Sequence, residues 1–272
     1  MTADMTPFAQ ATSVPALSAD TPEIVLIPCL ADNYAVLIHD AATGRTALVD
    51  APEAAPIAQV LAERGWTLTD ILLTHHHDDH IQGVAALRGS ARVIGAKADA
   101  HRLPALDLVV SPGDSVEICG LTTHVMDVPG HTRGHIAFHM PQARAVFTGD
   151  SLMALGCGRL FEGTPAEMWQ SLCDLAALPP ETLVYSGHEY TVGNAKFALS
   201  VDAENTALHD RVVEILNLRE EGLPTVPATL ATELATNPFL RPHDPQIRAY
   251  LEMTDATDAE VFAEIRARKN RF

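Results

Sequence analysis

The stretch that most constrains the fold of this chain is residues 70–80, which read Asp-Ile-Leu-Leu-Thr-His-His-His-Asp-Asp-His. Its apolar run, residues 71–73, has the length and composition of a buried strand. The run ends in a loop with four histidines and two aspartates, the side chains that bind borderline divalent metals. Helix capping would explain one aspartate but not the histidines. The stretch therefore predicts a strand that ends at a metal site, with His76 and Asp78 as bystanders.

The composition describes an acidic globular protein. Its 272 residues are 47% apolar, enough for a sizeable core in one large domain or two. The net charge of −17 argues against a nucleic-acid surface. No apolar run approaches the roughly 20 residues that cross a bilayer. We expect a soluble, cytoplasmic protein without nucleic-acid or membrane partners, which is a monomer or a weak homodimer. Its four cysteines are scattered along the sequence, and we expect them to be reduced thiols.

The order of the apolar runs predicts three regions. Residues 1–22 contain no Lys or Arg and fit neither a secretory signal nor a presequence, so we expect a disordered or extended segment. Residues 23–190 mix strand and helix patterns, with a β-meander over 23–50 and helices over 54–64, 81–87 and 165–177. Residues 191–272 show only helical patterns, near 192–201, 203–219, 228–235 and 256–268. An α/β domain followed by a small helical domain is therefore predicted.

Three further apolar runs also end in potential metal ligands. Residues 125–128 lead to His135, residues 145–147 to Asp150, and residues 183–185 to His188. Because loops beyond strand ends converge on one crevice in open α/β sheets, these side chains are expected to join the histidine loop. Seven donors suit two ions better than one. The predicted ligands are His75, His77 and His135 for the first ion, Asp79, His80 and His188 for the second, and Asp150 between them.

Two neighbouring residues are left open. Asp50, which follows an apolar run, either orients a ligating imidazole or is a turn residue. His131 lies close to His135 but has no strand-end position of its own, so it is not assigned.

These features resemble the metallo-β-lactamase superfamily, through the T-H-x-H-x-D-H run at residues 74–80 together with His135, Asp150 and His188. Several longer segments are similar to one family within it, the hydroxyacylglutathione hydrolases or glyoxalase II. The resemblance covers about residues 23–272 and is carried by Pro-Cys-Leu-Ala-Asp-Asn-Tyr at 28–34, Phe-Thr-Gly-Asp-Ser-Leu at 147–152, Gly-Cys-Gly-Arg-Leu-Phe-Glu-Gly-Thr at 156–164, Gly-His-Glu-Tyr-Thr at 187–191 and Asn-Pro-Phe-Leu-Arg at 237–241.

The resemblance implies an αββα sandwich and a dinuclear thioester hydrolase that converts S-D-lactoylglutathione to D-lactate and glutathione. The family's ligand set coincides with the seven residues above, with Asp79 and Asp150 as catalytic groups and a metal-bridging hydroxide as nucleophile. Zinc is the favoured metal, with iron or manganese as alternatives. The resemblance also implies that the helical domain, residues 191–272, binds the substrate. The residues expected to bind glutathione are Arg159, Phe161, Tyr190, Arg266 and Lys269. Some relatives carry Lys and Tyr in place of Arg159 and Phe161.

Two alternatives follow from the same sequence. A mononuclear-iron sulfur dioxygenase of the superfamily would not need the second set of ligands. A non-catalytic binding module would be expected to have lost ligands, whereas all seven positions are filled here. The basic residues from Arg266 to Arg271 would in either case also stabilise the C-terminus of a helix, by about 0.3–1 kcal/mol.

Overall fold

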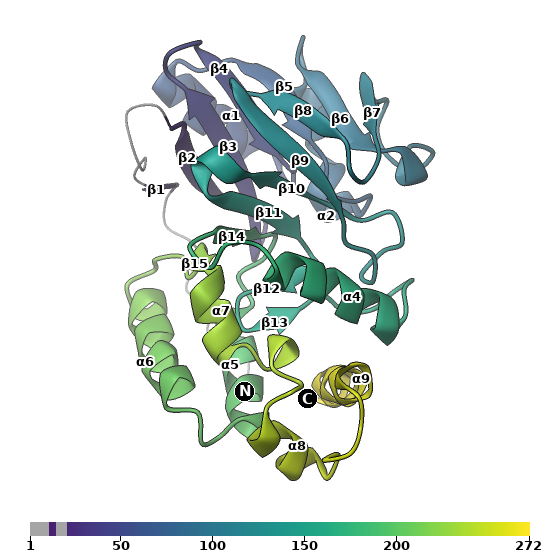
Figure 1. The fold of residues 1–272 in the computed structure, drawn as a ribbon. Helices are drawn as coiled ribbons and strands as arrows, with labels where there is room; N and C mark the ends of the chain where they lie inside the picture. Colours follow the sequence, from purple (N-terminus) through teal and green to yellow (C-terminus); the bar gives the residue numbers. More distant parts are fainter. Residues whose placement is uncertain (1–10, 15–20) are drawn as a thin grey trace. The chain divides into compact units, whose positions relative to one another are not determined.

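The computed structural model describes residues 11–14 and 21–272, which form two compact units (Figure 1). The first, which we call the sheet unit, contains described residues 11–14 and 21–127 together with Gly134–Gly149. The second, the helical unit, contains Val128–Arg133 and Asp150–Phe272. The predicted domain boundary after residue 190 stays a prediction. Most of the predicted N-terminal segment, residues 1–10 and 15–20, lies outside the described residues.

The first sheet of the sheet unit has its strands in chain order. They are β1 (Thr12–Val14), β2 (Glu23–Cys29), β3 (Asn33–Asp40), β4 (Arg45–Val49), β5 (Leu68–Leu72), β6 (Arg92–Ala96) and β7 (Leu108–Val110). Strands β1 to β4 pair antiparallel, which confirms the predicted meander, and β4 to β7 pair parallel. Because parallel neighbours need crossovers, helices separate β4 from β5 and β5 from β6. They are α1 (Ala54–Arg64), α2 (Asp78–Ile81) and α3 (Val84–Leu87); the short 3₁₀ turn η1 (Lys97–Asp99) follows β6.

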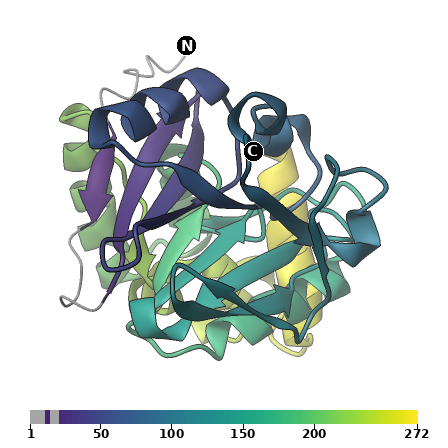
Figure 2. The ribbon, with the colours of Figure 1, turned by 90° about the horizontal axis from the view of Figure 1, so that it is seen from above.

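Helix α1 covers one face of this sheet. Ile57, Val60 and Leu61 recur at helical spacing and pack into a core with residues of β2 to β6. Figure 2 shows the ribbon of the molecule from above, with α1 in dark blue. The helix ends at Gly65, which has a left-handed φ of 66°, as predicted from the sequence.

The predicted helix over residues 81–87 is interrupted. The amide of Gly83 donates a hydrogen bond to the carbonyl of Ala51 at 2.8 Å, and a Cβ at this glycine would lie 2.9 Å from that oxygen. This close approach to the end of β4 separates α2 from α3.

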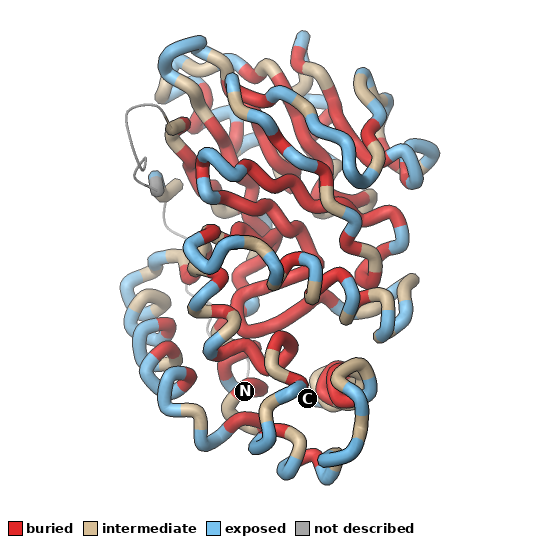
Figure 3. Tube along the Cα trace, in the orientation of Figure 1, coloured by how far each residue is buried: buried red, intermediate tan, exposed pale blue. Residues whose placement is uncertain are grey.

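The second sheet contributes an antiparallel meander to the same unit. Its strands there are β8 (Ser115–Ile118), β9 (Leu121–Asp127), β10 (Ile136–Met140) and β11 (Ala145–Gly149), with the turn η2 (Pro141–Ala143) between the last two. Strands β10 and β11 are buried along their whole length (Figure 3). The amide of Ile136 donates to the carbonyl of Thr74 at 3.0 Å, so the start of β10 lies beside the loop that follows β5.

The helical unit combines two short strand pairs with helices. The pairs are β12 (Leu152–Met153) with β13 (Gly156–Cys157), and β14 (Leu183–Ser186) with β15 (Ala228–Thr229). The helices are α4 (Pro165–Ala176), α5 (Thr191–Val201), α6 (Thr206–Glu220), α7 (Leu230–Thr236), α8 (Pro245–Leu251) and α9 (Asp258–Arg271), with the 3₁₀ turn η3 (Pro238–Leu240). The sequence patterns do not predict β15 or α8, because two strand residues show no alternation and the helix is only seven residues long.

Local signals set the ends of the long helices. Capping boxes at Thr164 with Glu167 and at Thr257 with Glu260 begin α4 and α9. No helix in the described part of the chain is long and apolar enough to cross a membrane. All four cysteines are free thiols, as expected.

Candidate metal centre

Asp50 links the ends of two adjacent parallel strands in the sheet unit. It follows β4 with a left-handed φ of 54°, and its carboxylate accepts hydrogen bonds from the amide of Thr74 at 2.9 Å and from its hydroxyl at 2.8 Å. The same carboxylate lies 2.8 Å from Nδ1 of His80. Of the two readings of Asp50, the geometry favours the one in which it orients an imidazole, because this contact leaves Nε2 of His80 for another partner.

Four predicted ligands gather beside Asp50 in the sheet unit. The ring of His75 lies 4.7 Å from that of His77, 4.2 Å from that of His80 and 4.6 Å from that of His135, centroid to centroid. Nε2 of His75 is 3.1 Å from Nδ1 of His77. Two nitrogens bound to one tetrahedral ion at about 2.0–2.1 Å would lie roughly 3.3 Å apart, so this pair fits one ion.

Asp79 is held beside this group by a residue from a distant part of the sequence. The side-chain amide of Asn33 donates to the carbonyl of Asp79 at 3.0 Å and to its carboxylate at 3.1 Å. The same oxygen of the carboxylate, Oδ2, also lies 3.9 Å from Nε2 of His80. His76, interpreted as a bystander, has its Nδ1 3.0 Å from the buried carboxylate of Asp99.

The helical unit brings together a second set of donors. Oδ2 of Asp150 lies 3.3 Å from Nε2 of His188 and 3.5 Å from Nε2 of His131. All three side chains are buried. These separations again suit atoms that share an ion, and a carboxylate between two imidazoles is the arrangement that a bridging ligand requires.

His131 is the residue that the sequence reasoning left unassigned. Its Nδ1 contacts the carbonyl of Arg159 at 2.8 Å, which leaves Nε2 toward Asp150. His135, the residue assigned instead, stacks on His75 with an interplanar angle of 16° in the sheet unit. The sequence signal for His131 is that it shares the run of residues 129–135 with His135. Two histidines in one run do not tell which of the two rings reaches a metal.

Two exposed aromatic side chains lie next to the second set. Tyr190, which is 42% exposed, stacks on His188 at 4.6 Å, and Phe161, which is 61% exposed, meets the edge of His131 at 5.3 Å. The guanidinium carbon of Arg159 lies 5.6 Å from the ring of Phe161. Exposed aromatic and cationic groups beside buried donors suit contact with a ligand.

Arg266 lies one turn before Lys269 on α9. It is buried, and its Nη1 donates to the carbonyl of Cys157 at 2.8 Å while its guanidinium carbon lies 5.2 Å from the ring of Phe239. Within the described residues, its Nε is buried without a hydrogen-bond acceptor. A buried donor of this kind is suited to an acceptor supplied by a ligand.

Lys269 is held less tightly. Its Nζ donates to the carbonyl of Gly193 at 3.1 Å and lies 5.3 Å from the ring of Phe197 and 5.4 Å from that of Phe272. Burial, reinforced by the charge of Arg266, lowers the pKa of Lys269 to about 8.

Two family models together match nearly the whole chain. The model described as the metallo-beta-lactamase superfamily matches residues 31–188, and the model described as the hydroxyacylglutathione hydrolase C-terminus matches residues 189–272. A hydroxyacylglutathione hydrolase from Ruegeria pomeroyi is 64% identical over 252 residues, which are 92% of this chain and 99% of that protein.

Solved structures show the fold. The crystal structure of the BLEG-1 B3 metallo-β-lactamase is similar with a TM-score of 0.62 and 22% identity, over 80% of this chain and 99% of that one. The crystal structure of TTHA1623 in a di-iron-bound form has a TM-score of 0.58 and 25% identity, over 79% of this chain and 98% of that one.

The predicted α/β metallo-β-lactamase fold with a helical C-terminal region is confirmed, and together with the histidine and aspartate groups it indicates a metal site. The continuous match from residue 31 to the last residue shows that this chain belongs to the hydroxyacylglutathione hydrolase family of the metallo-β-lactamase superfamily.

Proposed function

We propose that this protein hydrolyses S-(2-hydroxyacyl)glutathione thioesters, such as S-D-lactoylglutathione, to a 2-hydroxy acid and glutathione. The observation that carries the proposal is the 64% identity to a hydroxyacylglutathione hydrolase over nearly its full length. The two sets of histidine and aspartate donors, most of them buried, support it, since a thioester hydrolase of this fold needs no serine or cysteine nucleophile.

The metal site is proposed to hold two divalent ions. The proposed ligands are the predicted seven residues with His131 in place of His135, because Nε2 of His131 lies 3.5 Å from Asp150. They are His75, His77, Asp79, His80, His131 and His188, with Asp150 shared between the ions. Asp150 directly follows Gly149, the last residue of β11. Nitrogen and oxygen donors without thiolate suit zinc, iron or manganese. Zinc stays the favoured metal, and the di-iron form of TTHA1623 keeps iron as an alternative.

The proposed metal ions and the protein side chains would contribute differently to the reaction. Two divalent ions supply, when bound, a water of lowered pKa and a Lewis acid for the substrate carbonyl. Asp50 and the carbonyl of Arg159 hold His80 and His131 by Nδ1, which fixes the direction of each Nε2. The leaving thiolate needs no protein acid, because a thiol has a pKa near about 8.5.

The glutathione part of the substrate is proposed to contact Tyr190, Phe161 and Arg159 and to end at α9. Glutathione carries two carboxylates, and the buried Nε of Arg266 has no acceptor among the described residues. A guanidinium binds a carboxylate through two parallel hydrogen bonds, so Arg266 suits this role. Lys269, one turn further along the helix, adds a second positive charge.

We expect the affinity for the thioester to fall with rising pH because of Lys269. With its pKa lowered to about 8, the ammonium is charged below that value and loses its proton above it. When the pH rises from roughly one unit below this pKa to one unit above it, KM for S-D-lactoylglutathione should rise by about fivefold. Lys269→Arg should give a flatter profile, because a guanidinium stays charged. Initial rates across this range measure both; an equal rise in the arginine variant would contradict the role of Lys269.

His131 and His135 form a matched pair for testing the ligand set. We expect His131→Ala to lower the metal content by about one ion per chain, because its Nε2 faces Asp150. His135→Ala should retain more metal, because its ring stacks on His75 instead. Elemental analysis of both purified variants decides between them. Loss of metal only from His135→Ala would restore the assignment made from the sequence.

The proposed function is tested with the purified wild-type protein. Hydrolysis of S-D-lactoylglutathione should be abolished by a chelator and return on addition of zinc, iron or manganese, each tried separately. Oxygen consumption with glutathione persulfide, without thioester hydrolysis, would overturn the proposal in favour of the dioxygenase alternative.

A further inference from the structure

Asn237 begins the segment 237–241, to which neither metal binding nor direct substrate contact assigns a role. The residue is fully buried and uses both ends of its side-chain amide. Its Nδ2 lies 3.1 Å from the carbonyl of Met153 and 3.0 Å from that of Gly156, and its Oδ1 accepts a hydrogen bond from the amide of Phe239 at 3.0 Å. One side chain therefore joins the β12–β13 hairpin to the turn η3.

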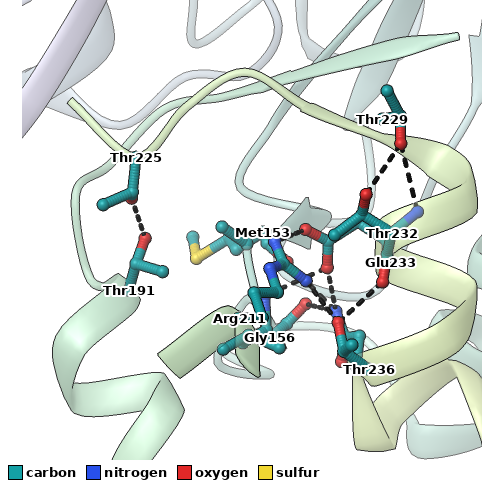
Figure 4. Close-up of polar contacts among 12 residues, drawn as sticks. Met153, Gly156, Thr191, Arg211, Thr225, Thr229, Thr232, Glu233 and Thr236 are labelled. Atoms are coloured by element: carbon teal, nitrogen blue, oxygen red, sulfur yellow. Dashed lines mark hydrogen bonds and ion pairs between the residues drawn. The ribbon is translucent and has the colours of Figure 1, made fainter. Parts of the chain in front are cut away.

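The Nδ2 end of Asn237 helps to fix the tip of the hairpin. Nδ2 also donates to Glu233 at 3.0 Å, and Glu233 accepts from the amide of Leu155 in the hairpin turn at 3.0 Å. Glu233 in turn pairs with Arg211 of α6, and Figure 4 shows this pair next to Met153 and Gly156. The hairpin is thus held at both carbonyls and at its turn amide by residues that end or follow α7.

The hairpin residue after Gly156 is the one that binds Arg266. The carbonyl of Cys157 accepts from Nη1 of Arg266 at 2.8 Å. A shift of β13 would move this acceptor, because Gly156 and Cys157 are consecutive residues that both pair with β12.

The Oδ1 end of Asn237 reaches Arg266 by a second route. It holds the amide of Phe239, and the ring of Phe239 lies 5.2 Å from the guanidinium carbon of Arg266. The same ring meets Phe262 of α9 at 6.0 Å, edge to face. Asn237 therefore contacts both structures that hold the guanidinium, namely the strand that supplies its carbonyl acceptor and the residue that supplies its aromatic face.

We infer that Asn237 is the positioning residue for Arg266: it sets the place of the guanidinium that receives a carboxylate of glutathione, without touching the substrate itself. This inference rests on the proposed function. It explains why an amide is needed at position 237, since a donor must face the carbonyls of the hairpin while an acceptor faces the amide of Phe239.

The test is a double-mutant cycle on the metal-loaded, full-length protein. Asn237→Ala, Arg266→Ala and the double variant are assayed with S-D-lactoylglutathione, and their thermal unfolding is recorded. Asn237→Ala should raise KM by about fivefold with kcat changed by less than about twofold. In the Arg266→Ala background the same change should alter KM by less than about twofold, because the group that Asn237 positions is then missing. Asn217→Ala, at an exposed asparagine of α6, is the matched control and should leave KM unchanged.

Phe239→Leu provides a second variant if Asn237→Ala does not fold. It keeps the backbone amide and most of the volume but removes the aromatic face, so KM should again rise by about threefold, and only when Arg266 is present. An equal factor on KM in both backgrounds, or a loss confined to kcat, would overturn the inference while leaving the proposed function intact. A wild-type protein that fails to hydrolyse the thioester would overturn the proposed function and the inference with it.

Discussion

Asp150→Ala is expected to lower thioester turnover by on the order of a thousandfold and to remove most of the bound metal. Oδ2 of Asp150 lies 3.3 Å from Nε2 of His188 and 3.5 Å from Nε2 of His131, so both imidazoles approach the same oxygen. Without this carboxylate, the two proposed ions would lose a shared anionic ligand and would repel each other with less compensation.

The measurement for Asp150→Ala pairs elemental analysis with kcat on the same preparation. Asp174→Ala is the control, because Asp174 is exposed on α4 and its carboxylate contacts only Gln170 among the described side chains. Wild-type metal content and turnover in Asp150→Ala would reject the shared-ligand role. Normal metal content with lost turnover would instead point to a role in the reaction alone.

Arg211→Leu is expected to lower the free energy of unfolding by about 3–5 kcal/mol, because it leaves the carboxylate of Glu233 buried without its counter-charge. Both side chains are almost fully buried, at 6% and 1% exposure. For a chain of this size the melting temperature should fall by roughly 10 °C. Thermal unfolding of the metal-loaded protein measures the loss.

Two comparisons make the result on Arg211 specific. Arg88→Leu removes a partly exposed pair with Asp107 and should cost less than about 1 kcal/mol. The double variant Arg211→Leu with Glu233→Gln should recover part of the stability lost in the single variant, because the buried group is then neutral and still accepts a hydrogen bond from the amide of Leu155. Equal losses of unfolding free energy in Arg211→Leu and Arg88→Leu would show that the buried pair contributes no more to stability than the partly exposed pair.

The sequence predicted those parts of the fold that depend on local pattern. The meander over residues 23–50 and the helix ending at Gly65 follow from apolar periodicity and from a glycine with positive φ, both of which are local properties. Strand ends also predicted which loops carry donors, because a run of apolar residues that stops at histidine or aspartate is visible without coordinates. The histidines grouped in the sheet unit and the contact of Asp150 with His188 agree with that reasoning, while the complete ligand set stays a proposal.

Contacts between residues far apart in the sequence could not be predicted from it. Asn33 reaches Asp79 across 46 positions, and no periodicity marks it. His131 lies four residues from His135, and which of the two rings faces Asp150 depends on the path of the intervening loop. In the sequence, Arg211 and Glu233 are single polar residues within helical patterns, which is also what solvent-exposed residues of a helix look like. Only their burial identifies them as a structural pair.

Within residues 21–272, the chain passes three times between the two compact units, after residues 127, 133 and 149. The short excursion Val128–Arg133 is made before most of the helical unit has been synthesised. On a ribosome, His131 therefore emerges well ahead of Asp150, Arg159 and the rest of the unit that it joins. A chain that has emerged from the ribosome as far as residue 149 contains every histidine of the cluster around His75 but not Asp150. Maturation of the second cluster must wait for the C-terminal half of the polypeptide.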